Sequence, residues 1–80
     1  MIAGRYRDPE ALYYAGRQYA RIGESERALD ALEKSVRGYF QVYALEHDPW
    51  LDSIRDSPRF AAVVATAREK QEEARRIWQA

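Results

Sequence analysis

One tyrosine and two arginines at helical spacing are the residues of this sequence best suited to recognising another molecule. Tyr13, Arg17 and Arg21 recur every four residues, so a helix would bring them onto one surface. A guanidinium group forms paired hydrogen bonds with a carboxylate, and a neighbouring ring adds apolar contact. The spacing predicts a site for an acidic peptide or, as the simpler alternative, an ordinary solvated arginine face.

Bond-making chemistry has little support in the sequence. There is no cysteine and only one histidine, His47, so the sequence lacks a thiol nucleophile and the residues of a histidine- or cysteine-based metal site. Asp48, Asp52 and Asp56 recur every four residues, but Asp48 suits a helix cap better than a metal ligand. No serine has a neighbouring base. We therefore expect a protein that is not an enzyme and has no metal and no cofactor.

Composition further limits the class of protein that this chain can be. The 80 residues contain 13 basic and 13 acidic side chains, so the formal charge is zero. This length predicts one domain, and the charge balance argues against a nucleic-acid partner, including a helix-turn-helix DNA reader. No apolar run approaches the roughly 18 residues of a membrane span, and no signal peptide is recognisable. We expect a cytoplasmic protein with no membrane partner.

Prolines and glycines mark the expected helix ends. Asp8-Pro9, Asp48-Pro49 and Ser57-Pro58 each place a capping side chain before a proline, which is tolerated at the first helical position. They predict helices that begin at residues 9, 49 and 58. Gly23 and Gly38 follow helical patterns and suit left-handed C-terminal caps.

The fold class expected from these signals is all-α. An antiparallel hairpin (about 9–22 and 25–37) is followed by short helices (about 41–46 and 49–55) and a long C-terminal helix (about 58–79). Residues 39–46 also have strand propensity, but no second strand is present to pair with them. The single domain then comprises a leading tail (1–8), the hairpin (9–40) and a helical cap (41–80).

Apolar stripes on these helices predict the core. Trp50, Leu51 and Ile54 are expected to pack under the last helix. The stripes of the three long helices consist of Leu12, Ala15, Gly16, Tyr19 and Ile22, then Ala28, Leu29, Leu32, Ser35 and Val36, then Phe60, Val63, Val64 and Ala67.

The end of the last helix has a different pattern. Residues 68–76 are nearly all polar, and Ile77 and Trp78 follow them. Ala67 and Ala74 are seven residues apart, as are Lys70 and Ile77, which is a weak heptad pattern with a charge in its seam. The segment is either a solvated helix with a frayed end or a helix that packs on another chain.

Residues 9–40 resemble a tetratricopeptide repeat, a helical hairpin of roughly 34 residues. The resemblance depends on a repeat-defining set in which small residues let the helices approach and Tyr19 and Leu32 fill the seam. Leu12 and Ala15 depart from the large residues that are common at their positions. The positions that carry the resemblance are Leu12, Ala15, Gly16, Tyr19, Gly23, Ala28, Leu32 and Ser35.

The remainder of the chain resembles the C-terminal tetratricopeptide segments of bacterial regulators and serine/threonine kinases. The matching text is Gly38-Tyr39-Phe40, then residues 48–55, then Pro58-Arg59-Phe60. Together, the two resemblances cover residues 9–67. They imply the end of a repeat array, and they imply no activity. Because such arrays usually need three or more units, we expect another segment or a second copy to complete the core.

The resemblance implies a scaffold or adaptor that binds a protein or peptide. In the family, one face of the first helix lines the peptide groove, and the matching residues here are Glu10, Tyr13, Arg17, Ala20 and Arg21. The sequence has no asparagine for the acidic-tail clamp of some family members. The alternative is a structural element that forms a homo-oligomer through the C-terminal helix, with Ile77 and Trp78 in the contact.

Overall fold

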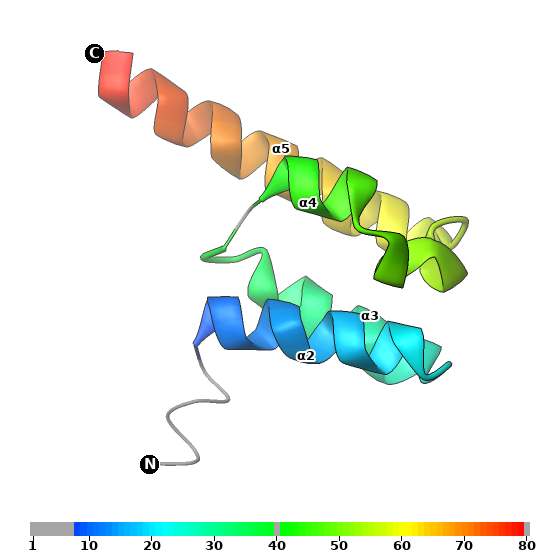
Figure 1. Cartoon of the computed structure of the whole chain (residues 1–80). Coiled ribbons are helices and arrows are strands. Elements are labelled where there is room, and N and C mark those ends of the chain that lie inside the picture. The colour runs from blue at the N-terminus through cyan, green and yellow to red at the C-terminus, as the bar shows by residue number, and fades with distance from the viewer. Residues whose placement is uncertain (1–7, 40, 80) are drawn as a thin grey trace.

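The structure is a computed structural model that describes residues 8–39 and 41–79 (Figure 1). These residues contain helices and no strand, which confirms the all-α class. The predicted leading tail lies outside the described residues except for Asp8. The elements are α2 (Pro9–Arg21), α3 (Ser25–Ser35), α4 (Val42–His47), the 3-10 helix η1 (Pro49–Ile54) and α5 (Pro58–Gln79).

The three proline signals are confirmed as helix starts. Pro9, Pro49 and Pro58 are the first residues of α2, η1 and α5. In each case, the side chain before the proline accepts a hydrogen bond, at 3.0 or 3.1 Å, from the backbone N–H two residues later. This bond satisfies one of the amides that a helix start leaves without an internal partner.

The helix ends differ in part from the prediction. Gly23 has a φ of 87° and forms the expected left-handed turn. Gly38 is not left-handed, so that prediction was wrong. A Cβ atom on Gly38 would lie 2.8 Å from Pro9 Cγ, so glycine is needed there for the close approach of two chain segments. The second helix ends at Ser35, and residues 49–54 form a 3-10 helix.

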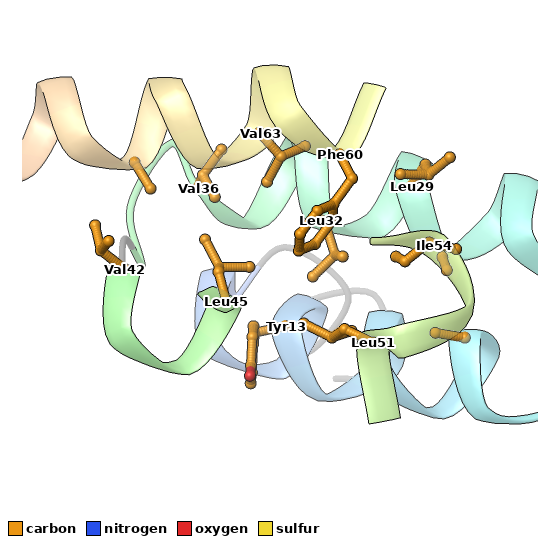
Figure 2. Packing of buried hydrophobic residues seen from close by; sticks show 13 residues of the cluster. Tyr13, Leu29, Leu32, Val36, Val42, Leu45, Leu51, Ile54, Phe60 and Val63 are labelled. Carbon is orange, nitrogen blue, oxygen red and sulfur yellow. The ribbon is translucent and has the colours of Figure 1, made fainter. Parts of the chain in front are cut away.

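The helices form two layers around one core. The antiparallel helices α2 and α3 make the first layer, and α4, η1 and α5 cover it (Figure 1). Leu32, Leu45, Leu51 and Val63 are fully buried between the layers, as Figure 2 shows. A Cβ atom on Gly16 would lie 2.8 Å from Leu32 Cδ2, which confirms the expected close approach of α2 and α3.

The buried side of α2 was mispredicted by about one residue, or roughly 100° around the helix. Tyr13, Gly16 and Ala20 are buried, whereas Leu12 and Tyr19 are only partly buried. The stripes of α3 and α5 agree with the prediction, except that Val64 is only partly buried. The two apolar-looking stripes of α2 are adjacent, and packing against η1 selects the one that the pattern did not favour.

Candidate functional site

Asp48 joins the hairpin to the covering layer. Its carboxylate accepts four hydrogen bonds, two of them on Oδ2, from the Tyr13 hydroxyl at 2.9 Å and from Arg17 Nε at 2.6 Å. Oδ1 accepts the other two, from Arg17 Nη2 at 3.2 Å and from the Trp50 N–H at 3.0 Å. One residue therefore caps η1 and forms a bidentate ion pair with α2.

The environment of Asp48 favours its charged form. Burial by itself raises the pKa of Asp48, but hydrogen bonds from Arg17, Trp50 and Tyr13 outweigh it, and the net pKa lies below the ordinary value. The bond with Asp48 also raises the pKa of Arg17. Burial, and then the bond with Asp48, raise the pKa of Tyr13. Near neutral pH, Asp48 and Arg17 are therefore both charged and form an ion pair.

Trp50 lies beside the same two arginines of α2. The guanidinium carbons of Arg17 and Arg21 lie 4.0 and 4.4 Å from its ring centroid. These are cation–π contacts, and they hold both side chains against η1. Trp50 thus contacts α2, whereas the sequence predicted that it packs under the last helix.

The predicted peptide-binding residues do not form one free surface. Tyr13 is only 5% exposed and belongs to the core, which contradicts the expectation that it shares an exposed face. Arg17 already has a carboxylate partner in Asp48. Arg21 and Glu10 are exposed. The covering layer places its own acidic residue where an acidic peptide was expected to bind.

A second surface of the hairpin remains uncovered. A shallow depression of about 270 Å³ is lined only by residues of α2 and α3. We call it the outer face. Its floor consists of Leu12, Ala15, Tyr19 and Ala31, and its charged rim consists of Arg27, Asp30 and Lys34. Ile22, the residue that follows the last residue of α2, is 70% exposed.

Sequence reasoning did not identify the outer face, although it listed part of it. Leu12 and Tyr19 were predicted as core residues, together with Gly16, Gly23, Ala28 and Leu32. Gly16, Ala28 and Leu32 are buried, and Gly23 forms the turn. The signal that could have identified it is the width of the apolar surface on α2. Leu12, Ala15 and Tyr19 lie on one side of that surface, and the covering layer packs on the other.

The rim of the outer face is tied to α5 at one point. Arg59 donates to Asp30 at 2.7 Å and to Glu33 at 2.9 Å, and it also contacts Glu26. Its hydrogen bond lowers the pKa of Glu33. Asp30 is therefore paired, and the remaining charges of the rim are the cations Arg27 and Lys34.

The end of α5 projects from the domain, as Figure 1 shows. Phe60, Val63 and Ala67 are buried, and Arg68 pairs with Glu46 of α4. Ile77 and Trp78, the predicted self-association residues, are 75% and 88% exposed. We call residues 69–78 the distal segment.

The remaining candidate residues do not gather into a site. His47 is exposed and stacks on Tyr43, with ring centroids 4.3 Å apart. Within residues 8–39 and 41–79, no three acidic, histidine or cysteine side chains are placed to hold a metal ion. In the same part of the chain, no helix is long and apolar enough to span a membrane.

Comparisons with known proteins bring no further assignment. No protein-family model matches the sequence, and neither the curated proteins nor the solved structures include a significant match.

Proposed function

We propose that this chain is a non-enzymatic protein–protein interaction module of the tetratricopeptide type, and that it binds a helix of a partner protein on its outer face. Three local features support the repeat type: the tight Gly23 turn, the close contact of Gly16 with Leu32, and the fully buried Ala28. They are the positions at which the sequence resembles the family.

The uncovered depression is the reason for placing the partner on the outer face. In repeat proteins, each hairpin is packed on both sides by neighbouring units. Here, one side of the hairpin is covered by α4, η1 and α5, whereas the outer face has no neighbour among the described residues. A helix with an apolar stripe would fill the depression, and acidic residues on that helix would pair with Arg27 and Lys34.

The inner side of α2 is a poorer binding surface. A partner carboxylate would have to displace Asp48 from Arg17 and Tyr13, and it would also remove the cap of η1. Breaking such an ion pair leaves an uncompensated charge, so binding there would act against folding.

A photo-crosslinking residue at position 12 tests this proposal. Proteins crosslinked in cells are identified, purified and titrated against the wild-type chain and two variants. Leu12→Asp changes the outer face, and Tyr43→Asp makes the same kind of change on the exposed side of α4. We expect Leu12→Asp to weaken binding at least about tenfold and Tyr43→Asp to leave it unchanged. Equal affinity for both variants, or no captured protein that binds when purified, would overturn the proposal.

A further inference from the structure

The charged residues of α3 are separated by sign around the helix. Arg27 and Lys34 lie on the side of α3 that borders the outer face. Glu26 and Glu33 lie on the flank from which they contact Arg59 of α5. Asp30 lies between the two sets, because a rotation of about 100° per residue places it roughly 40–60° from each of them.

Asp30 can therefore pair toward either side, and the structure shows which side it takes. Lys34 follows it by four residues and Arg27 precedes it by three, and helical neighbours at these separations form ion pairs. Asp30 instead accepts a hydrogen bond from Arg59 Nη2 at 2.7 Å. Among the described residues, no ion pair joins Arg27 or Lys34 to a carboxylate. The two cations of the outer face are therefore available because Asp30 is held toward α5.

The start of α5 fixes the position of Arg59. Ser57 caps the helix by accepting a hydrogen bond from the Arg59 N–H at 3.1 Å, and the next residue, Phe60, is only 3% exposed. The guanidinium group then lies against α3, where two hydrogen bonds of 2.9 Å join it to Glu33. A buried aromatic ring and a helix cap thus set the place of a charge on the surface.

Without Arg59, α3 would have three neighbouring carboxylates and no cation between them. Glu26 and Asp30 are four residues apart, Asp30 and Glu33 are three apart, and like charges at these separations repel. This repulsion would drive the Asp30 side chain toward Lys34 and Arg27. A carboxylate of the chain itself would then occupy the cations of the outer face.

We propose that Arg59 is a positioning residue of the outer face, because it holds Asp30 away from Arg27 and Lys34. The inference rests on the proposed function, since it names the residue that makes this face prefer an acidic partner helix. Arg59 itself is not among the residues that line the depression. It acts through Asp30, and its removal should change the charge of a face that it does not form.

Acylation of lysine in the free chain tests the position of Asp30. The chain has two lysines, Lys34 and Lys70 of the distal segment, so mass spectrometry compares their rates within one molecule. Ion pairing favours the protonated amine, which does not react with an N-hydroxysuccinimide ester. We expect Arg59→Gln to lower the ratio of the Lys34 rate to the Lys70 rate about twofold. Addition of Asp30→Asn to Arg59→Gln should restore the wild-type ratio.

Two further variants separate the position of Asp30 from net charge and from folding. Glu33→Gln removes the same charge from another partner of Arg59 that lies farther around α3 from Lys34, and it should not restore the ratio in Arg59→Gln. Asp30→Asn alone retains Arg59 and should leave the ratio unchanged, which tests the proposal even if Arg59→Gln lowers the melting temperature. A ratio that rises in Asp30→Asn, stays constant in folded Arg59→Gln, or is restored equally by Glu33→Gln would overturn the proposal.

The protein crosslinked at position 12 provides the second measurement. Its affinity should fall about two- to fivefold with Arg59→Gln, and it should recover when Asp30→Asn is added but not when Glu33→Gln is added. Unchanged acylation ratios, with a partner that is lost on Leu12→Asp, overturn the role of Arg59 alone. The expected ratios without any partner that binds when purified overturn the proposed function alone.

Discussion

The two sides of α2 have opposite roles, and their residue types do not reveal which is which. The inner side presents Tyr13, Arg17 and Ala20, and all three are held by the covering layer. The outer side presents Leu12, Ala15 and Tyr19, and only α3 meets it among the described residues. Polarity along the sequence suggested the reverse assignment, because arginines are usually solvated and leucines are usually buried.

This contrast shows that a charged side chain can make more contacts within the fold than an apolar one. Arg17 has a bidentate carboxylate and an aromatic ring to pack on. Leu12 is only partly buried and lines the outer face. A binding surface is therefore better identified by apolar side chains that the fold leaves exposed than by residue type.

Removing Asp48 should have the largest effect on stability. Asp48→Ala leaves Arg17 and Tyr13 without their acceptor and removes the cap of η1, so we expect a loss of about 2–4 kcal/mol. Urea denaturation measures it. Asp52→Ala is the matched control, because its carboxylate is exposed and, among the residues that the structure describes, pairs with Arg55 alone; it should change stability by less than about 0.5 kcal/mol. Equal losses in the two variants would mean that the Asp48 cluster does not join the layers.

Adding a methyl group at Gly16 should have an intermediate effect. The new Cβ atom would lie 2.8 Å from two atoms of the fully buried Leu32, so we expect Gly16→Ala to destabilise by about 1–2 kcal/mol after the gain in helix propensity. In a Leu32→Ala background the clash is absent, and the same change should be neutral or stabilising. A cost that persists in this background would contradict the packing explanation.

Acid should weaken the Asp48 contact selectively. The pKa of Asp48 is lower in the folded state than its ordinary value, so its contribution is present above about pH 4 and is lost as pH falls through the folded pKa. The stability difference between wild type and Asp48→Asn should shrink over that range. Parallel urea titrations between pH 7 and pH 3 measure it. A difference that is independent of pH would show that the carboxylate charge is not what joins the layers.

A change on the outer side should have the smallest effect on folding. Ile22 is 70% exposed, so Ile22→Asp should alter stability by no more than about 0.5 kcal/mol. Thermal melting at low protein concentration, where the chain is monomeric, checks this. A large loss would show that Ile22 is packed in solution and that the outer side is less open than its contacts indicate.

The sequence predicted most of the fold because its signals are local. A capping residue before proline acts within one turn, and it located the starts of α2, η1 and α5 correctly. The stripes of α3 and α5 were also predictable, since each has one clear apolar face. The stripe of α2 was not, because apolar residues lie on both adjacent faces, those of Leu12 and of Tyr13, and the position of η1 decides which face is buried.

The candidate site likewise has local features that the sequence predicts and contacts between layers that it does not. The sequence is sufficient to place Tyr13, Arg17 and Arg21 on neighbouring positions of one helix, because the helical repeat depends on the backbone alone. It also determined that Asp48 caps a helix, because capping involves residues two positions apart. The contact of Asp48 with Arg17, 31 residues away, which closes the inner side of α2, could be seen only once the fold was known. A contact over that separation depends on how the two layers pack, and the outer face is the surface that this packing leaves uncovered.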